Sequence, residues 1–101
     1  MSEVTVTHAP EASRYEAHLD GEPAGFAAYV LAQGAIVFTH TEIDDAFSGR
    51  GVGSALARGA LDQVRAAGDR RVVAECPFIA GWIDKHPDYA DLVDQTGGGA
   101  G

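Results

Sequence analysis

A glycine-rich turn between a predicted strand and a predicted helix constrains this chain more than any other feature. Gly49, Gly51 and Gly53 alternate at the turn, shortly after a stretch rich in β-branched and aromatic residues. Over residues 52–67, apolar residues recur at a spacing of four, which predicts a helix with one buried face. Gly68 follows in the position of a helix C-cap. The sequence therefore predicts a strand, a tight turn and a helix as one continuous unit.

The start of this helix is a predicted anion-binding site. The first N–H groups of a helix have no partner inside it, and the helix dipole adds partial positive charge there. The turn does not match the Walker phosphate loop, because no lysine follows it. It also does not match the dinucleotide fingerprint, because Ser54 and Leu56 stand where a third glycine is required. Two interpretations remain: a phosphate-binding turn of another type, and a glycine-rich turn without a ligand.

The first half of the chain predicts an antiparallel meander. Apolar and polar residues alternate in several short segments, and turn residues such as Asp20-Gly21 separate them. These segments are 4–7, 14–19, 23–31 and 35–43. Short turns join antiparallel neighbours, so we expect these four strands to pair in sequence order.

The second half predicts a β-α-β-α unit. The strand expected over 71–76 follows the helix closely, so it returns parallel to the strand at 35–43 by a right-handed crossover. A second helix is expected over 77–85, Pro87 ends it, and a last short helix is possible over 88–93. The predicted fold class is α/β (α+β), with a mixed sheet.

Length and composition indicate one small domain. A chain of 101 residues can form a single core, and a hydrophobic share of 46% favours a folded chain. We expect residues 1–95 to form this domain and residues 96–101 to be a disordered glycine-rich tail. We see neither a membrane span nor a signal peptide. The single cysteine, Cys76, excludes an internal disulfide and favours a reducing compartment, so we expect a cytoplasmic protein.

The charge distribution restricts the possible partners. A net charge of -8 argues against general binding to nucleic acid or to an anionic membrane. Residues 46–74 differ from the rest, because they carry five arginines against two aspartates. A basic segment at the anion-binding turn suits a phosphorylated cofactor, and the acidic remainder suits a cationic acceptor such as an amine. The alternative is that the helix arginines are simply solvated, which we favour for Arg65 and Arg70.

Four separated motifs carry a resemblance to a known family. They are His-Thr-Glu-Ile at 40–43, Gly-Arg-Gly-Val-Gly at 49–53, Cys-Pro-Phe at 76–78 and His-Pro-Asp-Tyr at 86–89. The turn resembles the pyrophosphate loop Gln/Arg-x-x-Gly-x-Gly/Ala of the GNAT superfamily of N-acetyltransferases, with Ser48 in place of Gln or Arg. The four motifs together resemble the short, single-domain GNAT-like proteins of the YjdJ type, over residues 4 to 94.

The resemblance implies a trimmed GNAT fold that binds acetyl-CoA as co-substrate. The pantetheine arm is then expected beside main-chain groups of Glu42 and Ile43. The pyrophosphate is expected on the turn, which consists of Ser48, Gly49, Arg50, Gly51, Val52, Gly53 and Ser54. The thioester would point into a gap where the strands at 35–43 and 71–76 splay apart. Ligands of open α/β sheets also bind outside the carboxyl ends of strands, which indicates the same place independently.

Cys76 and His40 are the candidate catalytic residues. Amine acetylation needs a base for the ammonium proton and an acid for the departing thiolate. Cys76 is expected at the gap, as that acid, as an acyl-carrying nucleophile, or as a small buried side chain. His40 is a candidate base, because histidine exchanges protons near neutral pH, and its alternative role is a hydrogen bond across the sheet.

The sequence departs from the GNAT pattern at two positions. Many GNAT enzymes have an Asn after the last core strand and a Tyr seven residues later that protonates the thiolate. Aligned in that way, Cys76 takes the Asn position and Ile83 takes the Tyr position. The usual acid is therefore missing, and Cys76 is the nearest replacement. We expect Trp82 in the core, and we expect His86 and Tyr89 to stabilise the end of the second helix.

The resulting prediction is an N-acetyltransferase that transfers an acetyl group to an unidentified amine by direct attack. A CoA-binding protein without efficient turnover is one alternative, and a small protein-interaction module on the same fold is another. The expected partners are acetyl-CoA and a small amine or a protein amine. We expect no metal, no nucleic acid and no membrane, and the sequence does not determine the oligomeric state.

Overall fold

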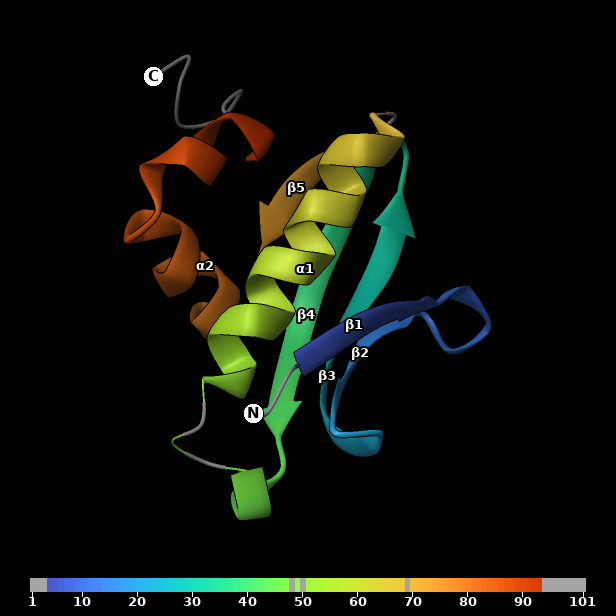
Figure 1. The fold of residues 1–101 in the computed structure, drawn as a ribbon. Helices are drawn as coiled ribbons and strands as arrows, with labels where there is room; N and C mark the ends of the chain where they lie inside the picture. Colours follow the sequence, from blue (N-terminus) through green and yellow to red (C-terminus); the bar gives the residue numbers. More distant parts are fainter. Residues whose placement is uncertain (1–3, 48, 50, 69, 94–101) are drawn as a thin grey trace.

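The computed structural model describes residues 4–47, 49, 51–68 and 70–93. It contains five strands, two α-helices and three short 3-10 helices within these residues (Figure 1). In chain order they are β1 (Val4–Ala9), η1 (Pro10–Ala12), β2 (Arg14–Leu19), β3 (Glu22–Ala32), β4 (Ala35–Ile43), η2 (Asp45–Phe47), α1 (Val52–Ala67), β5 (Arg71–Ala74), α2 (Pro77–Asp84) and η3 (Pro87–Leu92).

The five strands form one mixed sheet in the order β1-β2-β3-β4-β5. The pairs β1–β2, β2–β3 and β3–β4 are antiparallel, as short hairpin turns dictate. The pair β4–β5 is parallel, because α1 lies between these strands in the chain. This arrangement confirms the predicted fold class, in which a meander precedes a β-α-β-α unit.

The predicted helix over 52–67 is confirmed at both ends. Gly51 precedes it at φ 78°, and Gly68 follows it at φ 71°, so both caps use a left-handed backbone that suits glycine. The Gly68 N–H donates to the carbonyl of Val64. The capping glycines fix the helix limits, and the apolar spacing between them fixes which face is buried.

Two elements differ from the prediction. The strand expected over 71–76 ends at Ala74, because the N–H groups of Glu75 and Cys76 both donate to the single carbonyl of Phe38. Cys76 is therefore the N-cap residue of α2 and not the end of a strand. The last helix, expected over 88–93, is the 3-10 helix η3, and the predicted tail over 96–101 lies outside the described residues.

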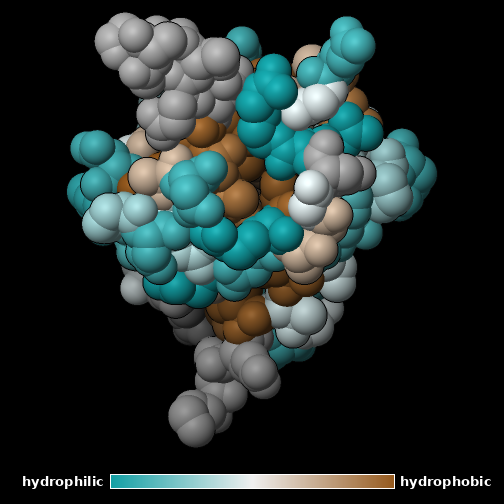
Figure 2. Space-filling model, turned by 90° about the horizontal axis from the view of Figure 1, so that it is seen from above, coloured by the Kyte–Doolittle hydropathy of each residue, from teal (hydrophilic) through white to brown (hydrophobic). Residues whose placement is uncertain are grey.

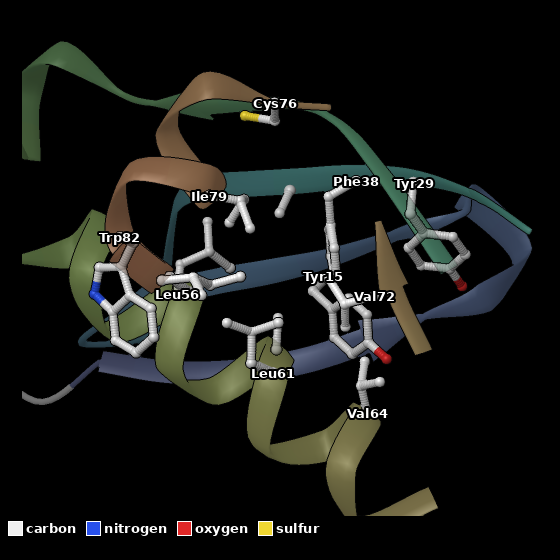
Figure 3. Close-up of a cluster of buried hydrophobic side chains, with 14 of the residues drawn as sticks. Tyr15, Tyr29, Phe38, Leu56, Leu61, Val64, Val72, Cys76, Ile79 and Trp82 are labelled. Carbon is white, nitrogen blue, oxygen red and sulfur yellow. The ribbon is translucent and has the colours of Figure 1, made fainter. Parts of the chain in front are cut away.

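The core lies between the sheet and the helices (Figure 3). Its largest fully buried side chains are Phe38, Leu56, Leu61, Ile79, Val52 and Val72. Each such side chain contributes about 1.5–3 kcal/mol to the free energy of unfolding through its removal from water. Trp82 belongs to this core, with 7% of its surface exposed, as expected from the sequence.

A β-bulge in β4 decides which side chains face the core. Ala28 pairs with His40 and Tyr29 pairs with Phe38, so Thr39 is an extra residue without a partner in β3. A one-residue insertion reverses the alternation of side chains beyond it. Thr41 therefore lies on the same face as Phe38, toward the helices, and His40 lies on the opposite face.

Candidate functional site

The turn before α1 has the backbone that the anion-site hypothesis requires. Gly49 and Gly51 adopt φ values of 80° and 78°, and a Cβ added at either position would meet no atom within 4 Å. Gly51 is the N-cap of α1, and it has no side chain to occupy the free N–H groups of the first turn. No acidic residue lies in this first turn. The helix start therefore presents main-chain donors in open space, which is the arrangement that binds phosphate.

Gly53 and Ser54 are held by side chains of α2. A Cβ on Gly53 would lie only 2.7 Å from the Cζ atom of Phe78, so the absence of a side chain at Gly53 makes room for this ring. The Trp82 indole N–H donates to the Ser54 hydroxyl over 2.9 Å. These contacts attach the first turn of α1 to α2 and stiffen the predicted cofactor loop.

The other predicted cofactor residues are placed in part. Val52 is 1% exposed and has its side chain in the core, so only its main chain is available to a ligand. Ser48 and Arg50 lie outside the described residues. Glu42 and Ile43 are the last two residues of β4. In the described part of the chain, β4 pairs here only with β3.

The predicted splay of two parallel strands lies between β4 and β5. Their ladder begins at Ala35 and Arg71 and ends at the pair Phe38 and Ala74. Beyond Phe38, β4 continues for five residues, while the chain after β5 turns into α2. One edge of β4 is thus left without a neighbouring strand within the described residues, and unpaired edge groups are available to an extended ligand.

Cys76 lies where this opening begins. Its side chain is 4% exposed, and its Sγ atom donates a hydrogen bond to Thr41 Oγ1 over 3.2 Å. Figure 3 shows Cys76 at the edge of the cluster of buried side chains. Thr41 was not among the predicted site residues, because the bulge at Thr39 that turns it toward Cys76 has no signature in the sequence. The sequence pattern alone assigns Thr41 to the opposite face.

His40 lies on the face of the sheet opposite Cys76. Its Nε2 atom is 2.9 Å from Glu42 Oε2, and the two side chains are 58% and 65% exposed. The ring centroid of Phe26, on β3, lies 6.1 Å from that of His40. The structure therefore joins His40 to Glu42 and does not bring its side chain together with that of Cys76.

A groove of about 290 Å³ adjoins this pair on the same face. Glu16, Glu42 and Asp44 contribute three carboxylates to its lining, and Arg14 contributes one guanidinium, which is bound to Glu16 over 2.9 Å. Phe26 also lines the groove, and the guanidinium of Arg14 lies 4.7 Å from the centre of its ring. A groove with an excess of carboxylates beside an aromatic ring suits a cationic ligand.

The end of α2 is fixed by a network around Tyr89. The Tyr89 hydroxyl donates to Asp62 Oδ1 over 2.7 Å and accepts from Arg58 over 3.3 Å. The hydrogen bond to Asp62, followed by burial, raises the pKa of Tyr89. His86 stacks on Trp82 at 3.9 Å and donates to the Trp82 carbonyl. These contacts agree with the structural role expected for His86 and Tyr89.

Ile83, at the position expected to carry the usual GNAT acid, is 6% exposed and belongs to the core. A buried aliphatic side chain has no proton to donate. Cys76, at the opening beside β4, stays the predicted replacement for that acid.

Three described arginines of the basic segment lie away from the glycine turn. Arg65 binds Asp91 over 2.9 Å, while Arg70 and Arg71 donate to carbonyls at the turn between β3 and β4. These three residues lie at or beyond the last turn of α1, far along the helix from its glycine turn. The end of the molecule seen in Figure 2 carries mostly hydrophilic side chains, with smaller hydrophobic areas between them.

The described residues contain no group of three or more His, Cys, Asp or Glu placed to hold a metal ion. None of their helices is both long enough and apolar enough to cross a membrane.

Comparison with known proteins identifies the family. A family model described as GCN5-related N-acetyl-transferase matches residues 14–92, which include the glycine turn, the opening beside β4, Cys76 and α2. Among curated proteins, no relative matches the chain. The family model covers most of the sequence and all of the candidate site, and β1 precedes the matched residues. The chain therefore belongs to the GCN5-related N-acetyltransferase family.

Proposed function

We propose that this protein is an acetyl-CoA-dependent N-acetyltransferase of the short, single-domain YjdJ type. One observation supports this most strongly: the free edge of β4 lies beside Cys76, while the same chain places an open glycine turn at the start of α1. An elongated ligand with a pyrophosphate at one end and a thioester at the other fits this pair of features. We take residues 1–95 as one domain, and the single Cys76 suits the reducing cytoplasm.

The proposed cofactor position follows from these features. The first-turn N–H groups of α1, from Val52 to Ser54, would bind the pyrophosphate, with Gly49 and Gly51 leaving room for it. Ser48 and Arg50 would add side-chain contacts at the same turn. The main chain of Glu42 and Ile43, at the free edge of β4, would bind the pantetheine arm. Cys76 would then face the acetyl group.

The proposed chemistry places an acid and a base on opposite faces of the sheet. His40, oriented by Glu42, would take a proton from the ammonium form of an amine that arrives along the carboxylate-lined groove. The free amine would attack the acetyl carbon directly, the carbon–sulfur bond would break, and the Cys76 thiol would give its proton to the departing thiolate. The second proton, which the nitrogen loses as the amide forms, would restore the Cys76 thiol. Thr41, which accepts the hydrogen bond from Cys76, would hold the sulfur in place.

Thermal melting with ligands tests this proposal. A ligand that binds only the folded state at 100 times its Kd stabilises it by about 2.7 kcal/mol, which raises the Tm of a domain this size by about 10–20 °C. We expect shifts of this kind with CoA and with acetyl-CoA, and a smaller one with ATP, which lacks the pantetheine arm. A thiol-release assay over a panel of amines then measures turnover.

The outcomes separate the alternatives. A shift with both forms of CoA and thiol release with an amine would support the transferase. A shift without thiol release would favour a CoA-binding protein without efficient turnover. No shift with any of the three ligands would overturn the proposal and would favour an interaction module on this fold.

A further inference from the structure

Phe78 is an exposed aromatic side chain that touches the glycine turn. It is 41% exposed, although most large apolar side chains of the described residues are buried. Its ring lies against Gly53, and the Cζ atom occupies the space of the missing Cβ. An aromatic surface in contact with water is thus fixed beside the first turn of α1, where the pyrophosphate is proposed to bind.

A shallow groove of about 250 Å³ continues from this ring along α2. It is lined by Phe78, Gly81, Trp82 and Lys85. These residues follow one another at spacings of three, one and three, so they share one face of the helix. Gly81 provides the hollow, because a Cβ there would meet no atom within 4 Å.

The groove carries positive charge. Lys85, the only lysine of the chain, lies at its far end, and no carboxylate lines it. Arg58 does not line the groove, although its guanidinium lies 5.4 Å from the centre of the Trp82 ring. The neighbouring Asp84 lines a different groove, on the side of α2 that faces β5. An aromatic surface that leads to a lysine is complementary to a planar ring that carries a phosphate.

We propose that this face of α2 binds the nucleotide end of CoA, and the proposal rests on the acetyl-CoA-binding function proposed above. Phe78 provides a stacking surface for the adenine ring, and Lys85 pairs with the 3′-phosphate of the ribose. The adenosine is joined directly to the pyrophosphate, so a pyrophosphate on the first turn of α1 brings it next to Phe78. Lys85 then makes the protein prefer CoA over carriers that lack the 3′-phosphate.

The experiment compares CoA with dephospho-CoA, which differs only by the 3′-phosphate. Trp82 is the single tryptophan and lines the groove, so its fluorescence reports binding directly. We expect the wild type to bind CoA about three- to tenfold more tightly than dephospho-CoA, the range of one exposed charge-assisted contact. We expect Lys85→Gln to abolish this preference. Arg70→Gln, which removes one positive charge at the other end of the molecule, should keep it.

A second variant tests the groove itself. Gly81→Leu fills the hollow on an exposed helix position without a steric conflict, and it replaces a poor helix former, so we expect an unchanged or higher Tm. Its affinity for both CoA and dephospho-CoA should fall, while affinity for phosphopantetheine should not.

The results separate the two proposals. If the wild type binds CoA and Lys85→Gln keeps the full preference over dephospho-CoA, or if Gly81→Leu binds both as the wild type does, the nucleotide groove is wrong and the transferase proposal stands. If the wild type binds no CoA at all, the transferase proposal falls and this inference falls with it.

Discussion

The Sγ atom of Cys76 donates a hydrogen bond to the hydroxyl oxygen of Thr41 over 3.2 Å. This contact joins the N-cap of α2 to β4, three residues beyond the last pair of the parallel ladder. It exists because the bulge at Thr39 turns Thr41 toward the helices. Thr41, and not His40, is therefore the β4 residue whose side chain contacts the sulfur, and any role of Cys76 in catalysis involves this pair.

The first prediction concerns the role of Cys76. Direct attack by the amine with Cys76 as acid predicts no acetyl adduct after incubation with acetyl-CoA alone. We expect Cys76→Ala to lower turnover about 100-fold, the typical effect of losing a general acid, and Cys76→Ser to retain part of the activity. Intact-protein mass spectrometry and thiol release measure the two effects.

Thr41→Val is the matched variant for this prediction. It keeps the shape of Thr41 and removes the acceptor of the sulfur hydrogen bond, so turnover should fall less than in Cys76→Ala. An acetyl adduct that maps to Cys76 and passes to an amine would contradict direct attack. If Cys76→Ala keeps full activity, Cys76 contributes only to packing and not to catalysis.

The second prediction concerns Gly51. A valine there adopts a left-handed backbone that costs at least roughly 1–2 kcal/mol, and it also projects a branched side chain into the proposed phosphate site. Gly21→Val is a matched control, because Gly21 has φ +85° and equally open surroundings but lies in the hairpin between β2 and β3. Both variants should lose similar stability, and only Gly51→Val should lose CoA binding in calorimetry. If the two variants bind CoA with equal affinity, the pyrophosphate does not bind at this turn.

The third prediction concerns His40 as the base. A base acts on the proton of the amine and not on CoA, so its loss should slow turnover without weakening CoA binding. We expect His40→Gln to lower kcat about 100-fold and to bind CoA as the wild type does. His18→Gln, in a residue of β2 that lines the same groove, should change KM for the amine and leave kcat largely unchanged. A wild-type kcat in His40→Gln would exclude this role.

The fourth prediction concerns stability at alkaline pH. The hydrogen bond to Asp62 and burial raise the pKa of Tyr89 above its ordinary value of 10.0. A group whose pKa is raised on folding stabilises the fold below its unfolded pKa, and this contribution is lost as the pH rises through the folded pKa. Denaturant unfolding of the wild type should therefore show a loss of stability above about pH 10.

Tyr89→Phe separates this contribution from other alkaline effects. It removes the hydroxyl, which should cost about 1 kcal/mol at pH 8, because Asp62 is exposed and regains water. Between pH 8 and pH 11 the variant should lose less stability than the wild type. Tyr29 also has a raised pKa, mainly through burial, so a smaller alkaline loss should persist. An identical loss in both proteins would show that Tyr89 does not ionise on unfolding.

The fold was largely predictable from the sequence, because local signals agreed with one another. Gly51 and Gly68 mark the ends of α1, and the apolar spacing between them defines its buried face. The hairpin turns gave the order of the antiparallel strands. The end of β5 at Ala74 was missed, because it depends on the Phe38 carbonyl, which accepts two N–H groups from a distant part of the chain.

The site was only partly predictable, because its side chains meet through tertiary contacts. The glycine turn and Cys76 have local signatures, so the sequence indicated them. The pairing of Cys76 with Thr41 depends on a bulge, and the packing of Phe78 on Gly53 depends on the angle between α1 and α2. Neither relation is encoded in the spacing of residues along one element.

A titration with acetyl-CoA, followed in the proton–nitrogen NMR spectrum of the labelled protein, tests the proposed binding site directly. The largest shift changes should fall on the amides of Gly51, Val52, Gly53 and Ser54, together with Glu42, Ile43 and Cys76. The amides near Arg70, at the other end of α1, should stay unchanged. A spectrum that does not change, or changes centred on the Arg70 end while the glycine turn is unaffected, would contradict the proposed binding of acetyl-CoA at this site.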